Sequence, residues 1–348
     1  MEIFFEGQNR RIHEVPAERK YWFIRTYGGE AYNSYLKGGY VGVGYNDVPF
    51  RYVQKATFNE PSSMEALTRY LQNRKDTNPR RVSRIANQLV SFNNEVSIGD
   101  CVIIPSRNSD ILALGTIESD TFLVNKPGTI NVNGQIIELP EKRRKIKWQK
   151  SIPKDDPRND IKAVTASHYG ITNVSFYSDT IEAIVSSLYI KNQQACLVIQ
   201  IDQDEEINAF ELNRFLSDLT YFYQEFCSEN GTQLDEDLRI KIKLQSAGKM
   251  LLKAGGYVGI LGLATMIALS NNNKLKVDAK NFKVEGSSDG LLKSITDFFD
   301  RNEERRERAA RFDDSIKNLK ANRDTTSKLI EHVTEKPKES RPQEKGKK

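Results

Sequence analysis

The stretch from Lys20 to Val48, "KYWFIRTYGGEAYNSYLKGGYVGVGYNDV", crowds Trp, Tyr, Arg and Gly more densely than any other part of the chain. Within it, "YWFIRTY" and "GGYVGVGY" are short aromatic and β-branched runs bounded by glycine, a composition typical of strands. Either these aromatic side chains form the core of a small β-barrel, or some of them line a pocket for a flat ligand. Both alternatives make this part of the chain predominantly β.

Strand signals continue as far as Trp148. Three further segments are predicted to be strands: "DCVIIPS" (100–106), "ILALGTIES" (111–119) and "RKIKW" (144–148). Between the last two, Asn133-Gly134 in "NVNGQIIEL" is the strongest short signal for a hairpin turn.

Two helical patterns lie between these strands. "PSSMEALTRYLQNR" (61–74) opens with proline and serines and spaces its apolar residues on one face. "RRVSRIANQLVSFNNEV" (80–96) has apolar residues at helical spacing, with basic residues on the other side. The first part of the chain is therefore predicted to be a β-rich domain with flanking helices.

The length of 348 residues fits two domains better than one. The segment "QKSIPKDDPRND" (149–160) has two prolines, mixed charge and no periodicity, as linkers do. We therefore predict a first domain over residues 1–150, a linker over 151–160 and a second, α+β domain over 161–300.

The second domain mixes helical and strand patterns. "TIEAIVSSLYI" (180–190) and "NAFELNRFLSDLTYFYQEFCSENG" (208–231) are predicted helices. "QACLVIQID" (194–202) is a predicted buried strand, and "DLRIKIKLQSAGKMLLKAG" (237–255) alternates as a strand or hairpin does. The overall fold class predicted from the sequence is α+β.

The segment that bears most on protein class is residues 254–269, "AGGYVGILGLATMIAL", which contains no charge. A helix of these 16 residues would span about 24 Å, against about 30 Å for the hydrocarbon core of a membrane. Its four glycines would allow close helix packing in either setting. Two interpretations stay open: a glycine-rich apolar helix buried in the second domain, or a short membrane-inserting helix that acts in an oligomer.

Charge is unevenly distributed along the chain. Residues 1–150 carry a net +6, residues 151–250 carry −7, and residues 251–348 carry +6. A basic first domain and a basic end fit an anionic partner, although surfaces also vary this much without a partner. Residues 301–333 are predicted to form a charged, mostly exposed helix, and residues 334–348 a disordered basic tail.

Cysteine usage is light. Cys101, Cys196 and Cys227 are widely separated and form no C-x-x-C, which argues against a disulfide framework or a zinc ribbon. We expect Cys196, inside an apolar strand, to be a small core residue. The start "MEIFFEGQNRRIHEV" has no apolar run long enough for a secretory signal. The expected location is the cytoplasm, with inner-membrane association through residues 254–269 as the alternative.

The sequence offers little support for catalysis. It has no G-x-x-x-x-G-K-[ST] and no G-x-S-x-G, and its three histidines, at 13, 168 and 332, are too scattered to indicate a metal site. Neither a metal nor a cofactor is predicted. A nuclease of the restriction type would need an Asp and a following acid-x-Lys on a strand. The nearest candidates lack that spacing: Asp202, Asp204, Glu236, Asp237 and Lys241.

Residues 15–150 resemble the PUA-like superfamily, specifically the EVE-type domains at the N-terminus of modification-dependent restriction endonucleases and other bacterial defence proteins. The chain departs from the usual pattern at Tyr45, where many relatives have tryptophan, and in the hairpin inserted around Asn133-Gly134. The resemblance depends on the order of five motifs: "WFIR" (22–25), "GGYVGVGY" (38–45), "IGDCVIIPS" (98–106), "ALGTIES" (113–119) and "RRKIKW" (143–148).

The resemblance implies a small β-barrel that binds nucleic acid, often a modified base turned out of the helix into an aromatic-lined cavity. A flipped base needs aromatic faces to stack on and polar groups to read its edge. The ligand-binding candidates are Trp22, Arg25, Tyr40, Tyr45 and Asp47. For any one of these rings, burial in the barrel core is the alternative. The phosphate-contacting candidates are Arg80, Arg81, Arg84, Arg143, Arg144 and Lys145.

Three functions remain as hypotheses. The first is a nucleic-acid or nucleotide sensor of a bacterial antiphage system, a homo-oligomer whose second domain serves as effector or oligomerisation module. The second is a membrane-inserting effector regulated by the first domain. The third is a modification-dependent nuclease with a divergent active site.

Overall fold

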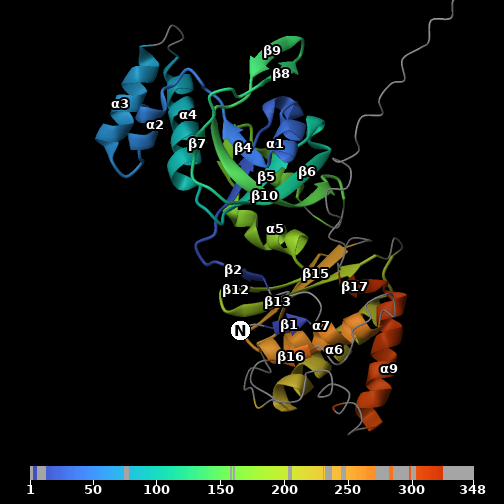
Figure 1. The fold of residues 1–348 in the computed structure, drawn as a ribbon. Coiled ribbons are helices and arrows are strands. Elements are labelled where there is room, and N and C mark those ends of the chain that lie inside the picture. The colour runs from blue at the N-terminus through green and yellow to red at the C-terminus, as the bar shows by residue number, and fades with distance from the viewer. Residues whose placement is uncertain are drawn as a thin grey trace, which may run out of the picture. The chain divides into compact units, whose positions relative to one another are not determined.

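The computed structural model divides into two compact units (Figure 1). The first unit includes Trp22–Pro153 and His168–Thr172, and the second comprises Met1–Tyr21, Lys154–Ser167 and Asn173–Thr326. The structure describes residues 3–5, 13–73, 78–156, 159, 161–202, 206–229, 231, 237–243, 248–270, 282–284, 298 and 303–323.

A curled, barrel-like sheet of seven strands forms the centre of the first unit (Figure 1). Its main path runs β11-β3-β5-β6-β10-β4, with β7 paired to β10. The strands are β3 (Tyr21–Ile24), β4 (Tyr40–Val43), β5 (Cys101–Pro105), β6 (Ile111–Ile117), β7 (Phe122–Leu123), β10 (Lys142–Pro153) and β11 (Ile171–Asn173).

The long, curved strand β10 organises this sheet (Figure 1). Its first residues pair with β4 on one side and with β7 on the other, and from Ile146 onward it pairs with β6. The register shifts between Trp148 and Lys150, which marks a β-bulge. Bulges bend a strand and increase its twist, so this irregularity helps the sheet to curl. The strand also includes residues 149–153, so the segment proposed as a linker is in part a strand.

Four helices accompany the sheet: α1 (Tyr32–Gly38), α2 (Phe50–Lys55), α3 (Pro61–Gln72) and α4 (Pro79–Val90). We name α2, α3 and α4 the helical lobe (Figure 1). The sequence predictions of helices over 61–74 and 80–96 are confirmed, although the second continues beyond Val90 as a π-turn (Ser91–Glu95). Helix α4 begins with the Asn78 side chain accepting from the backbone N–H of Arg80, which satisfies one of the free helix donors.

A hairpin of β8 (Thr129–Val132) and β9 (Gln135–Glu138) forms a separate two-stranded sheet. Asn133 and Gly134 both have positive φ, 51° and 85°, as a type I′ turn requires. The hairpin predicted from Asn133-Gly134 is therefore confirmed.

The second unit contains a six-stranded sheet in the order β14-β15-β13-β12-β2, with β17 paired to β13. The pairing of β2 with β12 is parallel, whereas the other pairs are antiparallel. The strands are β2 (His13–Val15), β12 (Leu188–Lys191), β13 (Gln194–Ile201), β14 (Arg239–Lys243), β15 (Gly248–Ala254) and β17 (Ala321–Arg323). A separate pair joins β1 (Ile3–Phe5) to β16 (Phe282–Val284).

Alternation along β13 divides this sheet into two faces, because successive side chains point to opposite sides. Leu197 and Ile199 pack with helices α6 (Ala209–Glu229), α7 (Tyr257–Ser270) and α9 (Glu303–Asn318). Cys196 and Val198 belong to a smaller cluster on the opposite face, where α5 (Ser178–Val185) contributes Ala183. Cys196 is thus a buried core residue, as expected.

Two assignments in this unit need correction. Residues 180–190 were predicted to be one helix, but α5 ends at Val185 and residues 188–191 form strand β12. Ser186 already has an extended backbone, and the β-prone residues that follow pair with β13. The N-terminal residues 13–15 were assigned to the first domain, yet they pair with β12 in the second unit.

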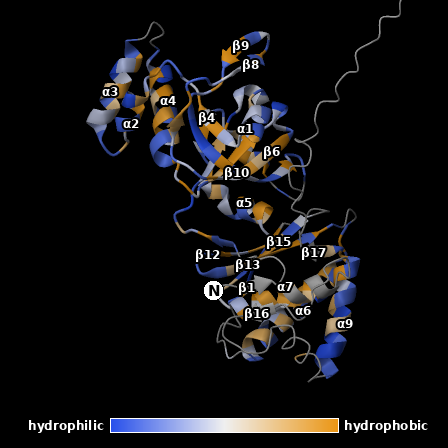
Figure 2. Ribbon diagram, viewed as in Figure 1, coloured by the Kyte–Doolittle hydropathy of each residue, from blue (hydrophilic) through white to orange (hydrophobic). Residues whose placement is uncertain are grey.

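The apolar segment 254–269 forms the end of β15 and helix α7, which packs against α6, α9 and the sheet. Six apolar residues of the helix lie inside the core of the second unit, where Figure 2 shows hydrophobic helices together: Ile260, Leu261, Leu263, Ala264, Met266 and Ile267. A Cβ at Gly259 would lie 2.5 Å from the Tyr223 ring, so glycine permits this close packing. The buried-helix interpretation is therefore confirmed. In the described residues, no helix is both long enough and apolar enough to cross a membrane.

The charged helix predicted over 301–333 is present as α9, which buries Phe312 and Ile316 and exposes most of its charged residues. The chain then turns into strand β17, so the prediction of helix is wrong for residues 321–323. The predicted tail, 334–348, lies outside the described residues.

A tyrosine cluster at the end of β4

Four tyrosines and one arginine come together where β4 begins and ends. Tyr27 lies on a 3-10 turn after β3, Tyr35 on α1, and Tyr40 and Tyr45 at the two ends of β4. We name these four residues with Arg143 the tyrosine cluster. They belong to the border of the first unit's core, with Tyr35 and Tyr40 buried and Tyr27 and Tyr45 half-buried.

Arg143 lies over the ring of Tyr40. The guanidinium carbon is 4.0 Å from the ring centroid, within the range of a cation–π contact. The Tyr40 ring is also 5.1 Å from that of Tyr35, with the planes inclined by 53°. The Tyr35 hydroxyl donates to the backbone carbonyl of Gly42, and this bond holds the Tyr35 side chain against β4. Because Arg143 and Tyr35 contact its ring and the residue is buried, Tyr40 does not offer an open face for stacking.

Tyr27 and Tyr45 form the more exposed part of the cluster. Burial and the nearby phenols of Tyr45 and Tyr40 raise the pKa of Tyr27 to about 12. The hydroxyl stays protonated at neutral pH, so it can both donate and accept a hydrogen bond. A Cβ at Gly44 would lie 2.6 Å from the Tyr27 hydroxyl, so glycine allows this ring to approach the backbone after β4.

Backbone strain is concentrated around these rings. Tyr27 and Tyr45 have φ of 52° and 65°, and on a neighbouring turn Asn108 and Ser109 have 54° and 61°. Left-handed backbone costs about 1–3 kcal/mol at a non-glycine residue and tends to occur at functional sites. The two turns are close: a Cβ at Gly29 would lie 2.2 Å from the backbone of Arg107. Bulky tyrosines held in this strained conformation suggest a built site.

The loop after β4 is fastened to the start of β10. The buried Lys142 ammonium donates to the carbonyl of Tyr45 at 3.0 Å, and burial lowers the pKa of this lysine. Asn46 donates to the carbonyl of Leu139 at 2.9 Å and accepts from the N–H of Glu141 at 3.0 Å. These bonds set the position of the Tyr45 backbone before any ligand arrives.

Trp22 and the polar candidates lie elsewhere. Trp22 is 4 % exposed and its indole N–H donates to Asp100 at 2.8 Å, so it belongs to the core and not to the cluster. Asp100 also accepts from the N–H of Ser97, so its carboxylate stabilises the turn before β5. The guanidinium carbon of Arg25 lies 5.9 Å from the centroid of the Phe23 ring. Asp47 is exposed, and its backbone carbonyl accepts a hydrogen bond from the Tyr70 hydroxyl.

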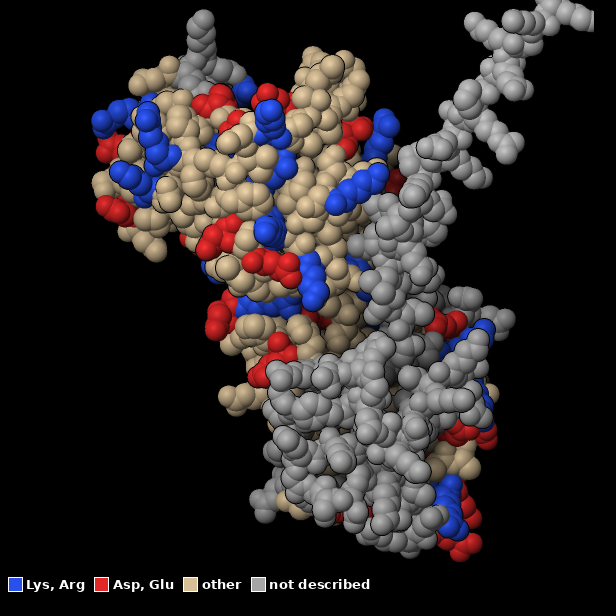
Figure 3. All heavy atoms as spheres, viewed as in Figure 1, with Lys and Arg blue, Asp and Glu red and all other residues tan. Residues whose placement is uncertain are grey.

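The basic candidates have different environments. Arg80, Arg81 and Arg84 are exposed on α4, and Lys145 is exposed on β10. Figure 3 shows several Lys and Arg side chains over the helical lobe. Arg144, by contrast, is 2 % exposed and donates to the backbone carbonyls of three other residues: Phe92, Asn93 and Ser119. We therefore withdraw Arg144 from the phosphate-contacting set.

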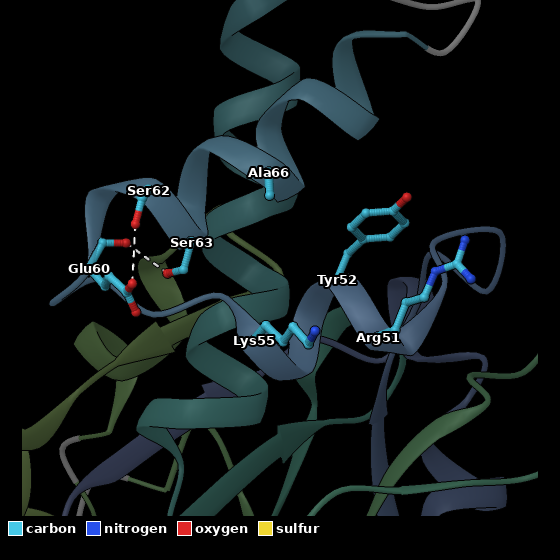
Figure 4. Close-up of a pocket in the computed structure, with 7 residues that line it drawn as sticks. All are labelled: Arg51, Tyr52, Lys55, Glu60, Ser62, Ser63 and Ala66. Carbon is cyan, nitrogen blue, oxygen red and sulfur yellow. Dashed lines mark hydrogen bonds between the residues drawn. The ribbon is translucent and has the colours of Figure 1, made fainter.

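A hollow lies between α2 and the start of α3 (Figure 4). Lys55 and Tyr52 extend from α2, while the Ser62 and Ser63 hydroxyls donate to the side chain and backbone of Glu60, at 3.2 and 2.7 Å. The negative charge of the Glu60 carboxylate would repel an anion in this hollow. The hydroxyls of Ser62 and Ser63 already donate their hydrogen bonds to Glu60. This hollow therefore does not suggest a phosphate site.

The second unit holds a buried ionic cluster that no sequence motif indicates. Glu182, fully buried on α5, accepts from Tyr21 at 2.5 Å and lies 3.0 Å from Arg19 and 3.5 Å from His13. Asp179, one turn earlier, pairs with Lys191 at 2.9 Å and Lys253 at 2.5 Å. Each acid is neutralised by neighbouring bases, which is the pattern of a structural network.

The nuclease candidates do not form a common site where the structure describes them. Asp202 accepts from Gln200, whereas Asp237 accepts from the N–H of Gly255 and lies 3.8 Å from Arg239. Lys241 is exposed on β14. Asp204 and Glu236 lie outside the described residues. Across the described part of the chain, no three or more His, Cys, Asp or Glu residues are grouped so that they could hold a metal ion.

Comparison with known proteins leaves the function open. Residues 24–169, less than half of the chain, match a family model described as a domain of unknown function, DUF8426. The matched region contains most of the first unit, including the tyrosine cluster. No curated protein and no solved structure matches the chain.

Proposed function

We propose that the first unit is a PUA-like domain that binds nucleic acid and holds one base at the tyrosine cluster. The observation that carries this proposal is that Tyr27 and Tyr45, both half-buried and both in left-handed backbone, lie near Tyr40, whose ring is in contact with Arg143. Aromatic faces stack on any base, and a phenol hydroxyl can meet a base edge.

The cluster has the preorganisation that such a site needs. Lys142 and Asn46 fix the loop that carries Tyr45, and the Tyr35 ring packs against that of Tyr40. A ring held by packing loses little conformational freedom when a base stacks on it, so little binding energy is lost in ordering the site.

Phosphate contacts would come from exposed basic side chains of the first unit. Lys145 lies on β10 beyond Arg143, and α4 exposes three arginines at its start: Arg80, Arg81 and Arg84. Exposed Lys and Arg bind phosphates with release of counterions, which makes binding sensitive to salt. Arg143 serves a different purpose, because it stacks on Tyr40 and donates to the carbonyls of Pro140 and Pro127.

The biological role that fits this site is a sensor in bacterial antiphage defence, with the second unit as effector or oligomerisation module. The ordered motifs of residues 15–150 support this role through their resemblance to EVE-type domains. The role predicts that a strain expressing the chain resists some phages, and that loss of Tyr45 removes the resistance.

The direct test is binding of the full chain to labelled single- and double-stranded oligonucleotides, with and without modified cytosine. Asn tolerates left-handed backbone, so Tyr45→Asn removes the ring with little added strain at φ 65°. Stacking is worth about 1–3 kcal/mol per base, so Tyr45→Asn should weaken binding by about fivefold or more. Tyr169→Asn, at a tyrosine 61 % exposed, is the matched control.

Binding that falls with salt and with Tyr45→Asn, but not with Tyr169→Asn, supports the proposal. Equal affinity of the three proteins would contradict it, since the cluster would then contribute nothing. If the wild type binds no oligonucleotide at all, the proposed function is wrong.

A further inference from the structure

Asp218 lies on the buried face of α6 that packs against α9 (Figure 1). Phe215, one turn before it, and Phe222, one turn after it, both contact the Phe312 ring of α9, with centroids 5.3 and 5.6 Å apart. Residues three and four apart share a face of a helix, so Asp218 projects from the same face as both phenylalanines. Only 4 % of Asp218 is exposed. An ionisable group is thus buried in the apolar contact between α6 and α9.

The Asp218 carboxylate lacks the hydrogen bonds that normally accompany a buried charge. In the described part of the chain, no donor bonds to its buried Oδ2. Its Oδ1 lies 3.8 Å from a guanidinium nitrogen of Arg308, too far for a hydrogen bond. Buried charges are normally paired and hydrogen-bonded, because an uncompensated charge is costly away from water. The ionised form of Asp218 is therefore expected to weaken the contact that holds α9.

The charges around Asp218 compensate it only in part. Arg308 is held over the Tyr221 ring, with its guanidinium carbon 4.2 Å from the centroid, and donates to Glu304 at 3.3 Å. Helix α7, which packs against α6 and α9, contributes no charged residue. Burial outweighs the surrounding positive charge and raises the pKa of Asp218. Three arginines act on it by charge: Arg214 and Arg311, which are exposed, and Arg308.

We propose that Asp218 makes the docking of α9 onto α6 dependent on pH: the neutral carboxyl permits tight docking, and the ionised carboxylate loosens the helix. This device belongs to the second unit and does not rest on the proposed function. A carboxyl whose folded pKa is raised stabilises the fold below its unfolded value, about 3.9, and this stabilisation is lost as pH rises through the folded value. Helix α9 is therefore held less tightly at neutral pH than at acidic pH.

Other contacts keep α9 on the second unit when Asp218 is ionised. Arg305, near the start of α9, donates to Glu225 at 2.7 Å and also pairs with Glu229. Ile316, near the end of α9, is fully buried. The change with pH is therefore a local opening of one helix and not the unfolding of the whole unit.

The test measures hydrogen–deuterium exchange of residues 303–312 of α9 in the full chain, for the wild type, Asp218→Asn and Asp314→Asn. Asparagine has nearly the shape of aspartate but carries no charge. Asp314 is exposed on α9, so its variant removes an acid outside the buried contact and is the control. The proteins are compared with one another at each pH, because the chemical rate of exchange itself depends on pH.

At about pH 7.5 we expect residues 303–312 to exchange about threefold or more slowly in Asp218→Asn than in the wild type, and the difference should shrink toward about pH 4.5. Asp314→Asn should follow the wild type, and exchange in the first unit should be equal in all three proteins. Equal or faster exchange in Asp218→Asn at the higher pH would overturn the proposal, because the arginines would then stabilise the charged carboxylate. A difference that does not change with pH would also overturn it, because the substitution would then act through packing.

Discussion

The variant Glu182→Gln is expected to lower the free energy of unfolding of the second unit by about 3 kcal/mol or more. The side chains of Glu182 and Arg19 are 0 % and 3 % exposed and lie 3.0 Å apart. Loss of the carboxylate charge leaves a buried guanidinium without its counterion. Removal of one partner from a buried pair costs more than the pair contributes, because the remaining charge stays desolvated.

Two comparisons isolate this effect. Glu304→Gln removes the acid of an exposed pair, at 62 % exposure, and should change stability by about 0.5 kcal/mol or less. The double variant Glu182→Leu with Arg19→Met removes both charges and should be more stable than Glu182→Gln alone. Both tryptophans lie in the first unit, so their fluorescence reports on the unfolding of that unit. In Glu182→Gln, the urea midpoint measured by far-UV circular dichroism should therefore fall, whereas the midpoint measured by tryptophan fluorescence should not change. An unchanged circular dichroism transition would contradict the assignment of a structural role.

The same network predicts a dependence on pH. Burial would raise the pKa of Glu182, but the hydrogen bond of His13, the charge of Arg19 and the Tyr21 hydroxyl outweigh it and lower the pKa below its ordinary value. A lowered pKa stabilises the fold above the unfolded value, about 4.3, and the stabilisation is lost as pH falls through the folded value. Wild-type stability should therefore decline more steeply below about pH 5 than that of Glu182→Gln.

The second large effect is expected at Arg144→Met, which should destabilise the first unit by about 4 kcal/mol or more. The guanidinium donates to Phe92 at 3.0 Å, Asn93 at 2.6 Å and Ser119 at 3.1 Å, and methionine can replace none of these bonds. Three carbonyls then lose a charged donor inside the protein, and each such bond contributes about 1.5–3 kcal/mol.

Lys145→Met is the matched control, because the neighbouring side chain is exposed. Tryptophan fluorescence is the appropriate probe, because both tryptophans lie in the first unit. The urea midpoint that it measures should fall in Arg144→Met and stay unchanged in Lys145→Met. If Arg144→Met instead keeps full stability and loses salt-sensitive nucleic-acid binding, the arginine is a phosphate ligand and its structural role is wrong.

The environment of Arg144 shows what a strand pattern can reveal. On β10, Lys142, Arg144 and Ile146 share one face and are buried, whereas Arg143 and Lys145 face the other side. Side chains alternate between the two faces of a strand, so Arg144 lies on the same face as Ile146. Because an isoleucine is expected on the buried face, this alternation would have predicted a buried Arg144. Charge alone suggested a phosphate contact, because composition does not distinguish the faces of a strand.

Helices with strong periodicity and the Asn-Gly hairpin were predictable from local sequence. The tyrosine cluster was predictable in part: Tyr40 and Tyr45 lie in it, but Trp22 does not and Tyr27 was missed. The Tyr-Gly-Gly at residues 27–29 was a signal for a left-handed turn. The buried ionic cluster was not predictable, since Tyr21 and Glu182 are 161 residues apart and meet only in the fold.

The most direct test of the proposed function is hydrogen–deuterium exchange of the full chain with and without the tightest-binding oligonucleotide. We predict slower exchange in the backbone around Tyr27 and in the loop from Gly44 to Asp47, because a base stacked there would restrain both turns. The core around Trp22 should be unchanged. Protection confined to other segments, with none at these two turns, would show that nucleic acid binds elsewhere and would contradict the assignment of the tyrosine cluster as the base-binding site.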